Sequence, residues 1–487
     1  MKPNLQRMTR AAGAALLAGV LMTAGSQPAR AQSQQDEPKQ SPAVEQLKDK
    51  VKQLEQTVEE LKGQIKAIEN TQKEAAARQT TAAPVGEAIA AGAPAPVPGP
   101  APEPRQAEKK DGGGTFEVYG FAMLDMGYQF GQNHPDWFDT VRPTKLPAFK
   151  GEFTPSGQTY FSVRQSRLGA RSTTHTKYGD LKTVFEFELF GTGVDAGQTT
   201  FRLRHAYGEL GQFGAGQYWT AFGDTDAYPN SLEYWGPNGL VWYRNVQVRW
   251  MPLKGRNSLT IALERPGASG DQGNYADRVE LQGIKTKFAW PDLTGNVRFD
   301  RDWGHVQFSG IVRSIRWVDT NDDALDLGGS DVGWGGNVSS HLNFGKKDVG
   351  RFQFTYGEGI QNYMNDAPVD IGVQNNADAG DPRRPIKGVA LPVFGMSTFL
   401  DHTWNKKFTS AVGYSMLNIE NSSGQAPSAF HRGHYGLGNL LYHPTDRVMV
   451  GGEFQWGRRE NNTDGFSVND YRTQFSFKYN FSKVFEF

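Results

Sequence analysis

Residues 475–487 read FSFKYNFSKVFEF and place an aromatic side chain at every second position except Lys483. Period-two alternation predicts a β-strand with one apolar and one polar face. An ordinary sandwich strand would show the same period. A strand this aromatic at the end of a chain is more typical of a transmembrane β-barrel, whose outer face meets lipid and whose inner face meets a water-filled lumen. A terminal Phe such as Phe487 is typical of the C-terminal signal of bacterial outer-membrane proteins.

The same alternation recurs from Thr115 onwards, in segments separated by two alternating classes of connection. The short turns comprise residues 178–181, 211–213, 252–257, 300–304, 346–350, 405–407 and 443–447. The long polar loops comprise residues 131–157, 191–199, 223–240, 266–289, 319–331, 361–391, 421–431 and 460–468. These connections predict sixteen antiparallel strands with both barrel ends on the periplasmic side, and a barrel of this size encloses an aqueous channel. Residues 279–290 are the weak point, because a further strand there would break the even count.

A different period appears in residues 44–69, where apolar residues are spaced by alternating threes and fours. The positions are Val44, Leu47, Val51, Leu54, Val58, Leu61, Ile65 and Ile68. This narrow stripe predicts a coiled coil within residues 32–74, whereas a lone amphipathic helix would need a wider apolar face. Val and Leu at the core positions favour a dimer, and the Ile pair favours a trimer, so the heptads leave the order of the oligomer open.

The remaining N-terminal residues are predicted to be a signal peptide and a linker. Residues 1–31 combine a basic start, a short apolar run and the cleavage pattern Ala29-Arg30-Ala31, so the mature chain is expected to begin at Gln32. The apolar run is too short to span a bilayer as a helix. Residues 75–114 are rich in Ala, Pro and Gly and predict an extended spacer in front of the barrel at 115–487.

Composition narrows the function classes. The chain has no Cys, which excludes disulfides and thiolate metal sites, and it has 52 basic and 52 acidic residues, which argues against a nucleic-acid partner. A mean hydropathy of −0.58 is too polar for a helical membrane protein. The acidic run at residues 319–323 lacks the glycine and the final glutamate of a Ca²⁺-binding loop. With no catalytic or phosphate-binding motif, we expect no cofactor, no metal and no catalytic residue.

Lumen-facing arginines are the main candidate functional residues. On three strands, the apolar residues that alternate with them are expected to face lipid, where a charge would cost roughly 2–4 kcal/mol near the midplane. The predicted basic pore-lining residues are Arg167, Arg171, Arg202, Arg204 and Arg249. Arg298, Arg313 and Arg351 are expected to face inward on later strands. Rings of Arg select anions in pores, and Arg binds carboxylates bidentately. Glu186 and Glu188 also face inward and are expected to pair with Arg171 and Arg202, so a neutral lumen remains the alternative.

The loop at residues 223–240 is the candidate constriction. It carries the acidic residues Asp224, Asp226 and Glu233 and several aromatic residues, which favour burial over free solvation. If the loop folds into the barrel, these acids are expected to face the arginines across a narrow gap. Packing of the loop on a neighbouring subunit is the alternative.

Several stretches carry a resemblance to known porins. QSRLGAR at residues 165–171 resembles general bacterial porins, and residues 201–222, 226–239 and 244–250 resemble the DcaP-like porins. The signal peptide, heptads and Ala/Pro linker match that family's layout. The resemblance implies a trimeric, sixteen-stranded outer-membrane channel for small anions such as dicarboxylates. It also implies that Arg202, Arg204 and Arg249 belong to the channel wall.

The expected function is therefore passive diffusion of small, preferentially anionic solutes through an outer-membrane porin, with the coiled coil in the periplasm. The expected partners are two further copies of the chain, outer-membrane lipid and lipopolysaccharide, and the solutes themselves. An outer-membrane barrel enzyme is one alternative, but no strand presents a nucleophile and a histidine on one rim. A structural protein that tethers the layers of the envelope is the other.

Overall fold

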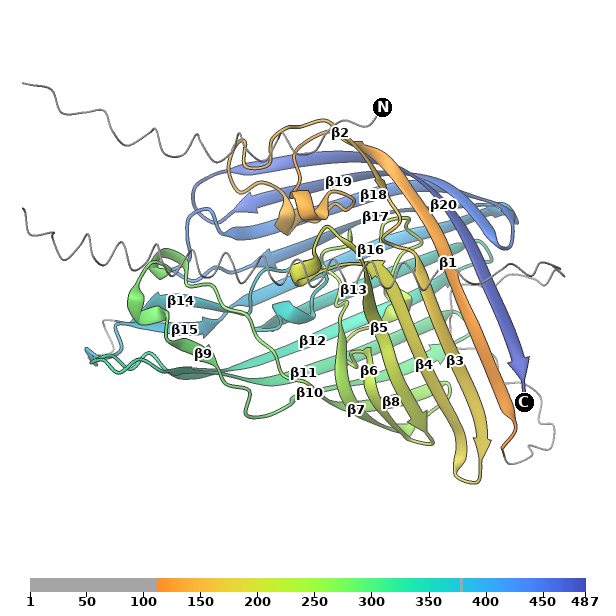
Figure 1. Cartoon of the computed structure of the whole chain (residues 1–487), viewed down its shortest axis with the longest axis horizontal. Coiled ribbons are helices and arrows are strands. Elements are labelled where there is room, and N and C mark those ends of the chain that lie inside the picture. Colours follow the sequence, from red (N-terminus) through yellow and green to blue (C-terminus); the bar gives the residue numbers. More distant parts are fainter. Residues whose placement is uncertain (1–111, 377–379) are drawn as a thin grey trace, which may run out of the picture. The chain divides into compact units, whose positions relative to one another are not determined.

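The computed structural model describes residues 112–376 and 380–487. Sixteen antiparallel strands in this part of the chain form a closed barrel, as predicted (Figure 1). They are β1 (Gly114–Gln129), β3 (Arg167–Thr176), β4 (Gly179–Phe190), β5 (Thr199–Leu210), β6 (Phe213–Trp219), β7 (Arg244–Leu253), β8 (Asn257–Glu264), β10 (Asp292–Arg301), β11 (Gly304–Asp319), β12 (Gly329–Phe344), β13 (Asp348–Glu358), β16 (Pro392–Asn405), β17 (Phe408–Ile419), β18 (Phe430–Thr445), β19 (Val448–Asn461) and β20 (Ser467–Glu486).

The first and last strands close the barrel. Strand β1 pairs with β20 from Thr115 opposite Glu486 to Gln129 opposite Arg472, and it pairs with β3 along its other edge. Closure satisfies the backbone hydrogen bonds of both edges, which a membrane-spanning sheet requires. Phe475, Tyr479, Phe481 and Phe485 of β20 are exposed on the outer surface, whereas Gln474 and Ser476, on either side of Phe475, are buried inside.

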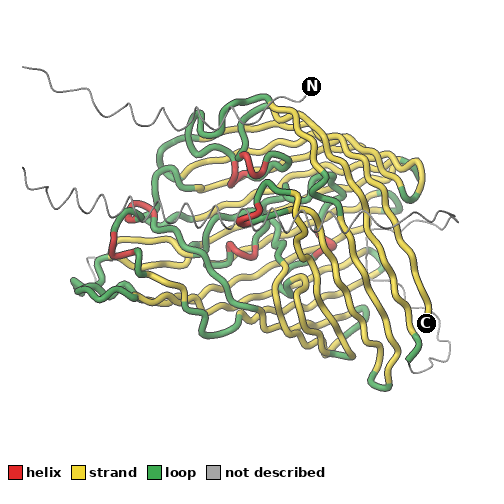
Figure 2. Tube along the Cα trace, in the orientation of Figure 1, coloured by secondary structure: helices red, strands yellow, loops and turns green. Residues whose placement is uncertain are grey.

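Short turns gather at one end of the barrel and long loops at the other (Figure 2). All seven predicted turns join consecutive strands. The uncertain segment at residues 279–290 contains a short helical turn, Val279–Leu281, and one short strand, β9 (Ile284–Thr286), which pairs with the loop end of β11. It extends the barrel rim and does not add a seventeenth crossing strand. Two further short pairings occur among the loops: β2 (Gln158–Ser162) continues the second strand against β1, and β14 (Ile371–Asn375) forms a hairpin with β15 (Ile386–Ala390).

The predicted signal peptide and coiled coil, and all but the last three residues of the predicted linker, fall in residues 1–111 and so lie outside the described part of the chain. Within residues 112–376 and 380–487, no helix is long and apolar enough to cross a bilayer.

The barrel interior holds a hydrophobic core built by loops that turn inward. Phe222 and Val241, from the connection between β6 and β7, pack with Ile360 and Tyr363, from the connection between β13 and β16. Inward residues of the wall strands, including Leu417, complete this cluster. The lumen is therefore narrowed by packed loops.

Candidate functional site

The predicted inward facing of the arginines is found on all three strands. Leu168, Phe201 and Val248 are exposed on the outer surface. Arg202, between the exposed residues Phe201 and Leu203, reaches Glu188 in the interior. The alternation that defined the lipid face therefore also positions the charged side chains.

Four arginines and two glutamates come together at one side of the lumen. We call this set the arginine–glutamate cluster: Arg167, Glu186, Glu188, Arg202, Arg204 and Arg244. The Arg204 Nε donates to Glu186 Oε1 at 2.6 Å, and its Nη1 contacts Glu188. Glu188 Oε1 lies 3.4 Å from the nearest nitrogen of both Arg202 and Arg244. Glu186 Oε1 lies 3.6 Å from Arg167 Nε.

The charges within the cluster do not balance. Four guanidinium groups share two carboxylates, so an excess of two positive charges remains. The side chains of Arg167 and Arg202 are 22% and 26% exposed, whereas that of Arg204 is 9% exposed. Arg167 and Arg202 are therefore more exposed to the lumen than Arg204, which mainly holds the two glutamates.

A β-bulge explains how Arg204 reaches both glutamates. The pairing of β4 with β5 shifts between Glu186 opposite His205 and Phe187 opposite Leu203, so Arg204 is the extra residue. A bulge re-aims the side chains next to it, and here both Arg204 and His205 are buried in the interior.

Two of the predicted pore-lining arginines lie outside the cluster. Arg171 pairs with Glu117 at 2.6 Å, so its expected pairing with Glu186 or Glu188 is wrong, whereas the pairing of Arg202 with Glu188 is confirmed. The Arg249 Nε donates to the Gln247 side chain at 2.9 Å.

Strand register decides which arginine of β7 joins the cluster. Ala206 of β5 lies opposite Gln217 of β6, and Trp219 of β6 lies opposite Arg244 of β7. Arg244 is therefore level with Arg204. Arg249 is five residues nearer the turn end, about 16 Å along the strand.

This placement predicts unequal effects for two substitutions on one strand. Arg244→Gln should lower the anion-to-cation permeability ratio roughly threefold at low salt, because it removes a positive charge from the cluster. Arg249→Gln, the matched control, should change the ratio much less. Reversal potentials in a salt gradient measure both. Equal effects of the two substitutions would contradict the assignment of Arg244 to the constriction.

The connection between β6 and β7 folds into the barrel, as its aromatic residues predicted. We call residues 220–243 the inner loop. Its Leu232 and Gly239 backbone amides donate to Glu453 of β19 at 2.7 Å and to Ser415 of β17 at 2.8 Å. Near its start, Asp224 accepts from Ser339 of β12 at 2.7 Å. The loop is thus fixed to several parts of the wall.

Aromatic rings of the inner loop lie against the arginines. The guanidinium carbon of Arg202 lies 5.1 Å from the centre of the Trp235 ring, and that of Arg167 lies 6.0 Å from the Tyr234 ring. The guanidinium carbon of Arg142 lies 4.9 Å from the same Trp235 ring, and Arg142 also pairs with Asp366 at 2.9 Å. Sequence reasoning missed Arg142, because no alternation in its loop indicates where that side chain points.

The acids of the inner loop do not face the cluster, so that expectation is wrong. Asp226 lies 2.7 Å from the guanidinium of Arg298 on β10, and Asp224 lies 2.7 Å from His305 on β11. Glu233 is fully buried and accepts from the Trp235 backbone amide, and burial raises the pKa of its carboxyl well above the ordinary value. The loop turns first towards β12, where the short helix Thr225–Ala227 packs. Asp224 and Asp226 therefore lie against a part of the barrel wall away from the cluster.

One group of possible metal ligands occurs in the described residues. Single ligand atoms of Asp224, Asp226 and His305 lie within 4.8 Å of one another. The guanidinium of Arg298 contacts both carboxylates, at 3.5 and 2.7 Å. Its positive charge already offsets theirs and would repel a cation, so the residues fit an ion pair better than a metal site.

Comparison with protein families gives a match over residues 117–481 to the family described as DcaP outer membrane protein. The chain belongs to the DcaP outer membrane protein family. Among solved structures, this DcaP-family chain is similar to the outer membrane channel DcaP of Acinetobacter baumannii, with 19% identity and a TM-score of 0.63, covering 77% of this chain and 99% of that one. No curated protein matches the chain.

More distant similarities are to other barrels. In-vitro folded OmpT of Vibrio cholerae is 14% identical with a TM-score of 0.45, covering 77% of this chain and 100% of that one. An anion-selective porin from Comamonas acidovorans is 10% identical with a TM-score of 0.48, covering 76% and 100%. The family and the fold together identify a bacterial outer-membrane barrel of the porin type, a class of non-enzymatic channels.

Proposed function

We propose that this DcaP-family barrel is a passive channel that prefers small anions, including dicarboxylates. The observation that carries the proposal is the unbalanced charge of the arginine–glutamate cluster beside the inner loop. Excess positive charge raises the local concentration of anions, and weak binding still permits exit. Arg also suits carboxylates because its planar fork donates two parallel hydrogen bonds.

The preference for dicarboxylates rests on two accessible arginines. Arg167 and Arg202 lie against Tyr234 and Trp235, which are neighbours in the inner loop. Two guanidinium groups held on adjacent rings suit the two ends of one small dianion. Arg204, which alternation alone would pair with Arg202 for this role, is held between Glu186 and Glu188.

Recording from single channels of the purified full chain in planar bilayers tests this function. We expect stepwise conductance and a reversal potential that indicates anion preference. Succinate should block or permeate at lower concentration than acetate, because it can engage both arginines. The preference should weaken at 1 M salt, where screening shortens to about 3 Å. Hydrolytic activity without conductance would favour the enzyme alternative, and a protein that inserts without conducting would favour a structural tether.

We also propose a homotrimer, on the basis of the heptad pattern in residues 44–69 and the resemblance to trimeric porins. The coiled coil would then lie in the periplasm. The mass of the full chain in detergent, measured by native mass spectrometry, distinguishes a trimer from the dimer that the Val and Leu positions alone would favour.

A further inference from the structure

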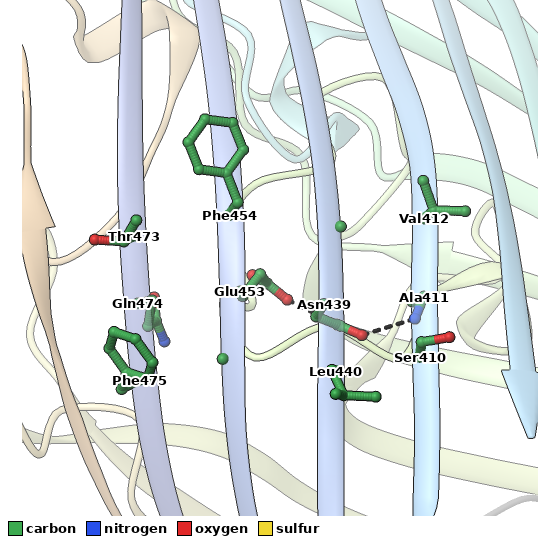
Figure 3. Close-up of a pocket in the computed structure, with 12 residues that line it drawn as sticks. Ser410, Ala411, Val412, Asn439, Leu440, Glu453, Phe454, Thr473, Gln474 and Phe475 are labelled. Atoms are coloured by element: carbon green, nitrogen blue, oxygen red, sulfur yellow. Dashed lines mark hydrogen bonds between the residues drawn. The ribbon is translucent and has the colours of Figure 1, made fainter. Parts of the chain in front are cut away.

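The outer face of strands β17–β20 carries a hollow of about 480 Å³ (Figure 3). Its outward-facing lining comprises Ser410, Val412, Gly438, Leu440, Gly452, Phe454, Thr473 and Phe475. Behind it, the Asn439 side chain accepts from the Ala411 backbone amide at 2.7 Å, where the β17–β18 ladder is interrupted. The hollow is thus a depression in the outer surface of the wall, separate from the constriction.

Two glycines create the space, and apolar side chains border it. A Cβ at Gly438 would meet no atom within 4 Å, and one at Gly452 would meet only the Phe475 ring, at 3.4 Å. Val412, Leu440, Phe454 and Phe475 are between 49% and 58% exposed. An apolar depression on the membrane-facing surface suits a hydrocarbon chain.

The same strands carry an aromatic stack nearer the loop end. The rings of Tyr414, His434 and Trp456 follow one another at 6.0 and 6.1 Å between centres. Trp456 also donates its indole N–H to Asn469 at 3.0 Å. Aromatic girdles of outer-membrane barrels lie at the membrane–water interface, so this stack marks the edge of the hydrocarbon region.

Two arginines lie on the same outward face as the stack, two residues further along β18 from His434 and along β19 from Trp456. Arg432 and Arg458 share the outward alternation of His434 on β18 and Trp456 on β19. Arg459, next to Arg458, turns inward and donates to the Leu146 carbonyl. Both share Glu460, at 3.8 and 2.8 Å, so one positive charge remains in excess. Their side chains are 39% and 32% exposed, and a charge near the interface costs only about 0–1 kcal/mol.

We propose that this face binds one lipopolysaccharide molecule, with an acyl chain in the hollow and a lipid A phosphate on Arg432 and Arg458. Charge complementarity selects the headgroup, because guanidinium groups bind phosphate bidentately. The distance between the arginines and the hollow also matches the dimensions of a membrane leaflet. Arg432 is six residues from Gly438, about 20 Å along the strand. With a strand tilt of about 40°, this is about 15 Å along the membrane normal, half the thickness of a hydrocarbon core.

The inference does not depend on the proposed anion preference. Its test uses the purified full chain in detergent, with diphosphoryl lipid A as the probe and native mass spectrometry to count retained lipid. Wild type should retain one lipid A per protomer. Combined Arg432→Gln and Arg458→Gln should weaken retention about thirtyfold, at roughly 1 kcal/mol per cationic residue near an anionic headgroup. Gly438→Leu should also weaken it, because the added side chain occupies the hollow.

Arg316→Gln is the matched control, since Arg316 is another exposed outward arginine near the loop end of a strand, β11. It should leave retention unchanged. Single-channel conductance should be the same in all variants, which checks that the barrels are folded. Three results would overturn the proposal. One is equal retention in the double variant, and another is equally tight binding of dephosphorylated lipid A. The third is a double variant whose oligomer dissociates, which would identify this face as a contact between protomers.

Discussion

Replacing Arg202 and Arg204 together with glutamine is expected to abolish most of the anion preference of the channel. The arginine–glutamate cluster would then retain two guanidinium groups and two carboxylates, and its net charge would fall from two positive to zero. Focused positive potentials of this kind change local ion concentrations by at least about tenfold at low salt, so the permeability ratio should fall by a similar factor. Reversal potentials across a salt gradient provide the measurement.

A substitution of the opposite sign separates charge from structural damage. Glu188→Gln removes a carboxylate at the centre of the same cluster and should raise the anion preference, because three guanidinium groups would then be in excess. Damage to the constriction would change the anion-to-cation permeability ratio of both variants in the same direction. An unchanged ratio in the double arginine variant would mean that Glu186 and Glu188 already neutralise the cluster, and the ion-pair interpretation would then hold.

Replacing Glu453 with alanine is expected to release the inner loop and give a larger, fluctuating conductance. The two oxygens of Glu453 accept from the Leu232 and Glu233 backbone amides at 2.7 and 3.3 Å. They also accept from Asn439 and Gln455. A buried donor left without its partner costs about 1–3 kcal/mol, so the loss of both backbone bonds exceeds thermal energy several-fold.

Glu209→Ala is the matched control for the loop. Glu209 also faces the interior from the wall, but its contacts are Lys254 at 3.2 Å and Tyr207, both outside the inner loop. The conductance of the Glu209→Ala channel should stay steady and close to that of wild type. Identical traces from the Glu453 and Glu209 variants would show that packing of residues such as Phe222 and Leu240 is sufficient to hold the loop.

Much of the barrel follows from the sequence because alternation is a local property. A strand with lipid on one side must present every second residue to lipid, so the exposed Phe201 and Leu203 determine that Arg202 points inward. Turn residues mark where each strand ends, which yields the even strand count. Tyr228, Tyr234 and Trp235 of the inner loop likewise predict burial, since three large rings are costly to leave in water.

The tertiary structure alone decided which charges meet. Whether Arg244 or Arg249 joins the cluster depends on the stagger between β5, β6 and β7, which many backbone pairings set together. The bulge at Arg204 is a second such feature, because an alternating sequence does not indicate where one residue will be left unpaired. The acids of the inner loop, and Arg142, depend on the path of loops that no period constrains. The sequence of each segment thus determines which face of a strand a side chain occupies. The register between strands and the path of the loops are determined only when distant segments pack.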